Sequence, residues 1–175
     1  MLNEVLAEEF GWSMAMDWRI LCLRVLGGLV LTALIGIERE SRHKSAGLRT
    51  HMMVGLAATT YSIITTEIVA GSYNDAVRLD PLRIVEAVTS GVAFLAAGMI
   101  VFSKGEVRGL TTGASLWLAA SIGLATGLGM WPLALAAALL GLFIARLTFL
   151  IPARRGKPAS EVDHSEPSPP PAVKS

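Results

Sequence analysis

The chain has 175 residues, of which 53% are hydrophobic and only 17% are charged, and its mean hydropathy is +0.56. A soluble domain of this size usually carries about 25% charged residues, so the composition favours an integral membrane protein and argues against a soluble domain. The formal net charge of +1 gives no reason to expect nucleic acid as a partner, and the single cysteine, Cys22, excludes an internal disulfide and a multi-thiolate metal site.

Residues 1–18 form an acidic stretch that contains no lysine or arginine. A cleaved signal peptide needs a basic beginning, so this stretch is not one. Apolar and tryptophan side chains are interleaved with the acids, which is typical of a segment lying at a membrane surface. We therefore expect an extracytoplasmic amphipathic segment over residues 1–18.

Five apolar spans follow and predict a transmembrane domain over residues 19–151. The spans cover about 20–37, 51–70, 82–102, 109–128 and 133–151. Each is close to the roughly 20 residues with which a helix crosses a bilayer. The third span has the clearest beginning, because Asp80 is a good N-cap and Pro81 fits the first helical turn. The predicted fold is an all-α integral membrane bundle of about five transmembrane helices.

Small residues in the third and fourth spans predict close helix packing. Apolar surface alone gives helices no reason to associate in lipid, and small side chains let their backbones approach. We expect the helices over 82–102 and 109–128, joined by a charged loop at 103–108, to form the core of the protein. The expected packing positions are Gly91, Ala97, Gly98, Gly123 and Gly127, and the last two make a GxxxG pattern that also fits a homodimer.

The basic residues predict the orientation of the chain in the membrane. Cytoplasmic loops carry an excess of Lys and Arg, which places the N-terminus outside and the C-terminus in the cytoplasm. The tail, residues 152–175, holds six of the eight prolines and cannot bury a core, so we expect a disordered Pro-rich cytoplasmic tail. The basic residues on the predicted cytoplasmic side are Arg39, Arg42, Lys44, Arg49, Lys104, Arg108, Arg154, Arg155 and Lys157.

Three charged residues fall at a similar depth in the predicted outer leaflet. They are Arg24, Glu67 and Glu86, in the first, second and third spans. Charges inside a membrane cost roughly 2.5–3.5 kcal/mol on insertion scales, so they tend to pair or to line an aqueous pocket. One interpretation is therefore an outward-facing polar site, and the other is that each side chain reaches the headgroups on its own.

A second polar group is expected on the cytoplasmic side. Its cations fit anionic lipid headgroups or a phosphate-bearing partner, and the alternative is that they only determine topology. The absence of Cys or an HExxH pattern near His43 and His51 argues against a zinc site. No phosphate-binding loop, dinucleotide fingerprint or nucleophile elbow is present, so nothing predicts an enzyme or a resident cofactor. The group comprises Glu38, Arg39, Arg49, Thr50, His51, Thr111 and Thr112.

Five segments of the sequence resemble the MgtC/SapB family of bacterial inner-membrane proteins. The resemblance covers about residues 20–150 and implies a hydrophobic five-helix domain in the inner membrane. Longer members add a soluble C-terminal domain similar to ACT domains, so this chain resembles a short form that lacks it. Many members also have an apolar residue where this chain has Glu86. The segments are ALIGIERE (33–40), AGLRTH (46–51), DPLRI (80–84), SGVAFLAAG (90–98) and GLTTGASLW (109–117).

The resemblance implies a link to magnesium and leaves two functions open. The best-studied type in the family is linked to growth at low magnesium and to restraint of the membrane ATP synthase. In the first hypothesis the protein is a regulatory or accessory factor that binds a membrane ATPase or ATP synthase subunits. In the second it transports Mg²⁺ itself by way of Glu67 and Glu86, with Mg²⁺ as its ligand. The first is favoured because no acidic residue lies near the middle of a span, where transporter sites usually lie.

Overall fold

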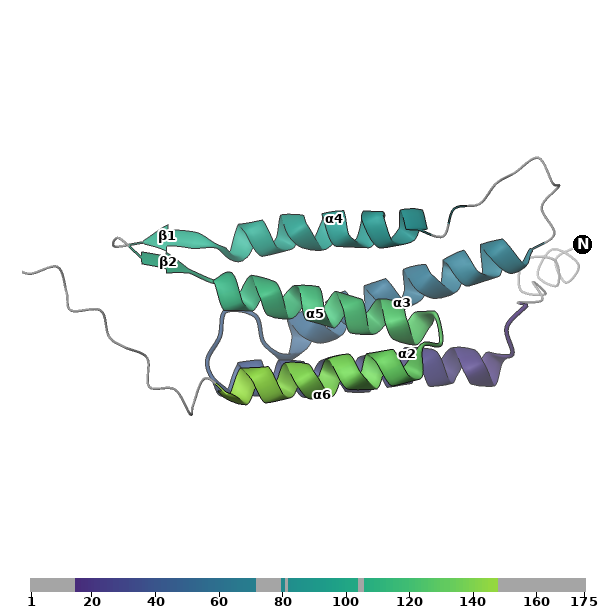
Figure 1. Ribbon diagram of the computed structural model, residues 1–175, viewed down its shortest axis with the longest axis horizontal. Helices are drawn as coiled ribbons and strands as arrows, with labels where there is room; N and C mark the ends of the chain where they lie inside the picture. Colours follow the sequence, from purple (N-terminus) through teal and green to yellow (C-terminus); the bar gives the residue numbers. More distant parts are fainter. Residues whose placement is uncertain (1–14, 72–79, 81, 104–105, 148–175) are drawn as a thin grey trace, which may run out of the picture.

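The computed structural model describes residues 15–71, 80, 82–103 and 106–147. Consecutive helices in this part of the chain run in opposite directions along one bundle (Figure 1). The helices α2, α3 and α4 are long and apolar enough to cross a membrane, and α6 is a shorter apolar helix. The all-α membrane bundle is therefore confirmed. Its helices are α2 (Trp18–Ser41), α3 (Leu48–Ala70), α4 (Leu82–Met99), α5 (Leu110–Gly127) and α6 (Trp131–Leu147).

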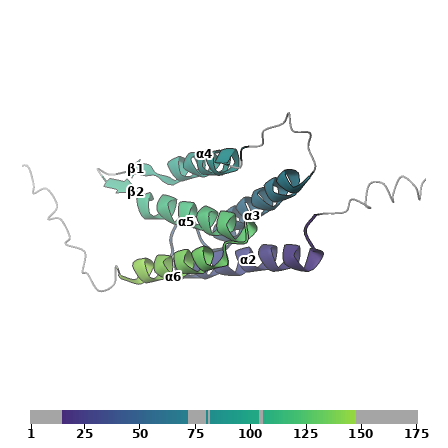
Figure 2. The same cartoon turned by 45° about the vertical axis from the view of Figure 1, so that its right-hand side comes forward.

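Helix α5 occupies the centre of the bundle. It contacts all four other helices and lies between α4 on one side and the pair α2 and α6 on the other (Figure 2). Leu116, Ala120 and Leu124 of α5 pack in one cluster with residues of α3 and α4. Ile122 and Ala125 pack in a second cluster with residues of α2 and α6. A helix that is buried on opposite sides cannot carry unpaired charges, and α5 contains no charged residue, only Thr and Ser among its polar side chains.

The most extensive helix contact joins α3 to α5, and small residues bring the two helices close together. A Cβ atom added to Gly123 would lie 2.4 Å from the carbonyl oxygen of Gly55, and one added to Gly127 would lie 2.5 Å from Cβ of Ser62. The GxxxG pattern of α5 is therefore occupied by α3 of the same chain. The extensive contact between α3 and α5 replaces the predicted central pair of α4 and α5.

Helix α4 lies at the edge of the bundle, and few of its positions are buried. Val88, Val92 and Ala96 are its buried positions. Nothing lies within 4 Å of a Cβ added to Gly91 or Gly98, and Ala97 is exposed. Within the described part of the chain no helix packs closely against Gly91, Ala97 or Gly98, because the row of Val88, Val92 and Ala96 faces the bundle; their role in packing stays a prediction.

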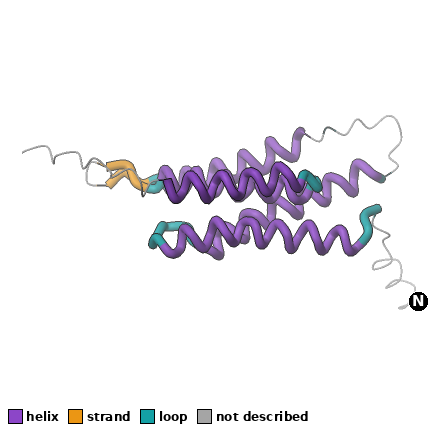
Figure 3. The backbone as a smooth tube through the Cα atoms, turned by 60° about the horizontal axis from the view of Figure 1, so that its bottom comes forward, coloured by secondary structure: helices purple, strands orange, loops and turns teal. Residues whose placement is uncertain are grey.

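A short β-hairpin replaces the charged loop that the sequence predicts between α4 and α5. Strands β1 (Val101–Ser103) and β2 (Glu106–Arg108) pair antiparallel and project from the end of the bundle (Figure 3). Gly109 then connects the hairpin to α5 with φ of 91°. A Cβ there would lie 2.0 Å from the carbonyl oxygen of Met99, so both backbone angle and space require glycine. We call this end of the molecule the hairpin end.

Two helices begin at side-chain caps, and the one at Asp80 is the cap that the sequence predicts. Asp80 accepts a hydrogen bond from the backbone N–H of Leu82 at 3.0 Å, and Asp17 accepts one from Arg19 at 2.7 Å. These bonds satisfy amide groups that have no partner within the helix. Most of the predicted amphipathic segment 1–18 and all of the predicted tail 152–175 lie outside the described residues.

Candidate functional site

The loop after α2 closes in a Schellman motif that gathers cations at the hairpin end. The N–H of His43 donates to the carbonyl of Glu40 at 2.9 Å, and the N–H of Lys44 donates to the carbonyl of Arg39 at 3.2 Å. His43 takes the left-handed conformation that this motif needs, with φ of 51°. Because the chain folds back here, Lys44 lies beside the end of the helix that carries Arg39 and Arg42.

A buried carboxylate holds two of these cations. Glu38 pairs with Nε of Arg39 at 2.8 Å and also with Nε of Arg42, one helical turn further along. The side chains of Glu38 and Arg39 are only 6% and 10% exposed. A buried ion pair rarely adds much stability over apolar residues, but removing one partner leaves an uncompensated charge. The cluster therefore fixes the two guanidinium groups in place.

His51 is fully buried and joins α3 to α5. Its Nδ1 lies 2.8 Å from the carbonyl oxygen of Gly47, and its Nε2 lies 3.0 Å from Oγ of Ser115. A carbonyl can only accept, so these partners assign the proton to Nδ1. The hydroxyl of Ser115 also lies 2.8 Å from the carbonyl of Thr112. Its single hydrogen can serve only one of the two acceptors at a time.

The other predicted residues of the hairpin end have different surroundings. Thr112 is buried, and its hydroxyl accepts a hydrogen bond from Ser45 at 3.3 Å. Arg49, Thr50 and Thr111 are exposed. The structure thus brings Glu38, Arg39, His51 and Thr112 into the junction of α2, α3 and α5, and leaves the remaining three at its surface.

At the opposite end Arg24 binds the end of α5. Its Nη1 donates to the carbonyl oxygen of Gly127 at 2.7 Å, one of the carbonyls that lack a partner within the helix. A cation at a helix C-terminus is also favoured by the helix dipole. Gly129 follows with φ of 79°, a left-handed conformation that favours glycine. The role that the structure gives to Arg24 is that of a C-cap.

Glu67 and Glu86 do not join Arg24 in a common cluster. The carboxylate of Glu67 accepts hydrogen bonds from the backbone N–H groups of Ala15 and Met16, at 2.7 and 3.0 Å. Glu86 is exposed on α4. Among the described residues, no ion pair links the three charged side chains that the sequence places at this depth. Their use as a cation site stays a prediction.

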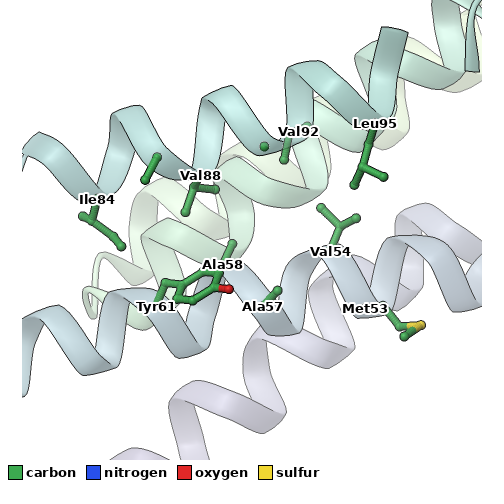
Figure 4. Close-up of a pocket in the computed structure, with 11 residues that line it drawn as sticks. Met53, Val54, Ala57, Ala58, Tyr61, Ile84, Val88, Val92 and Leu95 are labelled. Carbon is green, nitrogen blue, oxygen red and sulfur yellow. The ribbon is translucent and has the colours of Figure 1, made fainter. Parts of the chain in front are cut away.

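The described residues form no candidate metal centre, and the groove between α3 and α4 is apolar. Within the part of the chain that the structure describes, no three His, Cys, Asp or Glu side chains lie together in a way that could hold a metal ion. A groove of about 630 Å³ runs between α3 and α4, where Ile84, Val88 and Val92 point toward α3 (Figure 4). Its lining is apolar apart from the hydroxyl of Tyr61.

Buried hydroxyl groups, which the sequence reading did not single out, line the contacts of α5. Thr59 of α3 donates to the carbonyl of Gly123 at 3.1 Å and lies 3.2 Å from the hydroxyl of Thr126. Thr32 and Ser62 are buried and bond to carbonyls of their own helices. Their signal in the sequence is spacing, because Gly55, Thr59 and Ser62 recur on one face of the second span.

Comparison with known proteins places these features in a family. A family model described as "MgtC family" matches residues 25–152, well over half of the chain. The chain is 36% identical over 123 residues to "Putative magnesium transporter YhiD" of Escherichia coli (strain K12), covering 70% of this chain and 57% of that protein. It is 40% identical over 105 residues to "Protein MgtC" of Brucella abortus (strain 2308), covering 59% and 41%.

A third relative extends the same pattern. "Protein MgtC" of Salmonella typhimurium (strain LT2) is 39% identical over 118 residues, covering 67% of this chain and 48% of that protein. The chain thus spans about half the length of the curated relatives it matches. No solved structure matches the chain.

Proposed function

The chain belongs to the MgtC family, and from that premise we propose that it is a regulatory or accessory membrane protein linked to magnesium homeostasis. In this role it acts by binding a membrane ATPase or subunits of the ATP synthase, and it carries no ion itself. This is the first of the two functions that the sequence analysis leaves open.

The observation that carries this proposal is the tight packing around α5. A Cβ added to Gly123 or Gly127 of α5 would lie 2.4–2.5 Å from the nearest atom of α3. The hydroxyls of Thr59 and Thr126 beside these glycines bond to carbonyls of α5 and to each other. A hydrated cation moving along α5 would have to displace these contacts, whereas a protein that acts by binding keeps them.

The distribution of charge supports an orientation with the hairpin end in the cytoplasm. Arg39, Arg42, Lys44, Arg49 and Arg108 lie at that end, and the opposite end has Arg19, Arg24 and Arg83 among the described residues. The excess of cations follows the positive-inside rule. With this orientation the N-terminus lies outside. The membrane in this proposal is the bacterial inner membrane, where the family resemblance places proteins of this kind.

The second candidate function is transport of Mg²⁺, and one relative's name favours it. The E. coli relative bears the name "Putative magnesium transporter YhiD". In that function Glu67 and Glu86, both toward the end opposite the hairpin, would attract the ion, because Mg²⁺ is bound through one or two carboxylates with several retained waters. The contacts of Glu67 with Ala15 and Met16 would then compete with the ion.

Flux and regulation can be measured on the same protein. Purified chain is reconstituted into liposomes that contain a Mg²⁺-sensitive dye, beside the Glu86→Gln and Glu67→Gln variants. We expect no uptake above that of empty vesicles. Uptake that either substitution reduces would refute the accessory role and establish the transporter.

The regulatory arm uses ATP synthase reconstituted from the same organism. ATP-driven proton pumping is measured with and without the chain in the same vesicles, with matched amounts of an unrelated helical membrane protein as the control. We expect pumping to fall in a dose-dependent way only with this chain. Equal pumping in both samples would remove the ATP synthase as its partner, and a transport ATPase would be tested next in the same format.

A further inference from the structure

A cavity of about 480 Å³ lies at the hairpin end between α5 and α6. Three cationic side chains, Arg39, Arg42 and Lys44, line it together with Thr111 and Ser115. Its volume falls in the range of about 300–1,000 Å³ that is usual for ligand pockets. The cavity is separate from the apolar groove between α3 and α4 and from the charged residues at the opposite end.

The cations are held in place by the backbone and by one carboxylate. The Schellman motif fixes Lys44 beside the end of α2, and Glu38 pairs with Nε of both arginines. These ion pairs hold the two guanidinium groups at the wall of the cavity, and a guanidinium group can donate to more than one acceptor. The carboxylates of Glu38 and Glu40 also lie at this end of α2, but the residues that line the cavity include three cations and no acid, so its wall is electropositive.

The beginning of α5 adds to this positive potential. Thr111 lies in its first turn, and Gly109, at the N-cap position, has no side chain to satisfy the free N–H groups. The N-terminus of a helix carries a partial positive charge and binds phosphate groups through its N–H donors. The cationic side chains and the N-terminus of α5 are both positive, so together they favour the binding of an anionic ligand between them.

The far wall of the cavity has the opposite character. Leu118 of α5 and Leu140 and Ile144 of α6 line it, and Leu140 and Ile144 are exposed toward the surroundings of the bundle. A free phosphate ion would gain nothing from this wall. A phospholipid matches both parts, because its phosphate meets the cations and an acyl chain lies along the apolar side chains.

We propose that this cavity binds an anionic phospholipid, with the headgroup phosphate at Arg39, Arg42 and Lys44 and an acyl chain against α6. Basic pockets between transmembrane helices at the cytoplasmic side are a known way to bind such headgroups. The site goes beyond the regulatory role proposed above and does not depend on it, since it follows from this cavity alone.

Binding is tested on the detergent-solubilised full chain by native mass spectrometry. The protein is titrated with dioleoyl-phosphatidylglycerol and with dioleoyl-phosphatidylcholine, which share their acyl chains and differ in net charge. We expect phosphatidylglycerol to bind at least tenfold more tightly. Lys44→Gln should weaken it about fivefold, since a cation near an anionic headgroup contributes roughly 1 kcal/mol. Equal binding of the two lipids would overturn the proposal.

Two further variants separate the cavity from general surface charge. Arg49→Gln removes one exposed cation at the same end but outside the cavity lining, so it should change the affinity less than twofold. Ala114→Phe fills the cavity from an exposed position without changing its charge, and it should abolish the preference for phosphatidylglycerol. A loss with Arg49→Gln as large as with Lys44→Gln, or full binding to Ala114→Phe, would contradict the site.

The source of the phosphate is tested by competition. Glycerol 3-phosphate carries the headgroup chemistry without an acyl chain, and we expect no displacement of bound phosphatidylglycerol at millimolar concentration. Displacement at the concentration of the lipid itself would show that the cavity takes a soluble phosphate compound, and the lipid assignment would then be wrong.

Discussion

Replacing Gly123 with alanine tests whether the seam between α3 and α5 holds the bundle together. The added Cβ would lie 2.4 Å from the carbonyl oxygen of Gly55 and 2.9 Å from Cβ of Ala58. An ordinary contact begins at 3.4 Å, so the two backbones must separate by up to 1.0 Å. Overpacking of this kind costs about 1–3 kcal/mol, against a gain of about 0.5–1 kcal/mol from removing a glycine within a helix.

Gly91→Ala is the matched control, because it is the same substitution within a helix but meets open space. Its free energy of unfolding should rise by about 0.5–1 kcal/mol. Both variants are unfolded from detergent micelles by increasing the mole fraction of SDS, with helix content followed by circular dichroism. If Gly123→Ala is as stable as Gly91→Ala, the close contact between α3 and α5 does not contribute to the stability of the bundle. If Gly91→Ala is destabilised, that face of α4 is covered, contrary to its open surroundings.

Three further substitutions test the polar contacts in the same unfolding assay. Arg24→Met removes a charged hydrogen bond to the Gly127 carbonyl and should cost about 1.5–3 kcal/mol; an unchanged stability would show that the C-cap contributes nothing. His51→Ala leaves buried partners unpaired and should cost about 1–3 kcal/mol, more than Ser115→Ala. A larger loss with Ser115→Ala than with His51→Ala would refute the role of His51 in joining α3 to α5. His43→Gly relieves the left-handed backbone and should stabilise the chain by about 0.5–1 kcal/mol; a loss would contradict the Schellman motif.

Hydropathy was sufficient to place the helices, because a helix that crosses a membrane or is buried in the bundle must be a long apolar segment. The predicted third span begins where Asp80 caps α4. The boundaries differ most where polar residues continue a helix, as at the end of α2, which extends to Ser41. Hydropathy has no information on this extension, since Glu38 and Arg39 are buried by pairing with each other.

The sequence did not show which face of α4 packs. A helix surrounded by lipid has no polar side to mark its outside, so the row of Val88 and Val92 and the row of Gly91 and Gly98 were equally plausible. A better guide was complementarity between spans. The small residues of the second span recur with the same spacing as Gly123 and Gly127 of the fourth, and a match of this kind predicts a close helix pair.

The two predicted polar groups had different outcomes for a geometric reason. Depth along a span can be counted from its ends, but the direction of a side chain around the helix depends on packing. Arg24 and Glu67 therefore share a depth and bind different groups, Gly127 and residues 15–16. At the hairpin end Glu38 and Arg39 are neighbours in sequence, so their association needed no knowledge of packing. Ser115, on the same face of α5 as Thr112, was missed.

Helix α2 places arginines at both ends of α5, and the sign of the helix dipole makes these ends unequal. At the C-terminus of α5, Arg24 meets a carbonyl that needs a donor, so opposite charges satisfy each other. At the N-terminus, Arg39 and Arg42 share a cavity with Thr111 of the first turn, so positive charge meets the positive end of the dipole. Glu38 offsets only part of that charge. The first contact is structural, because donor and acceptor both belong to the protein. The second places cations on the wall of a cavity, which is the arrangement that the proposed anionic phospholipid fits.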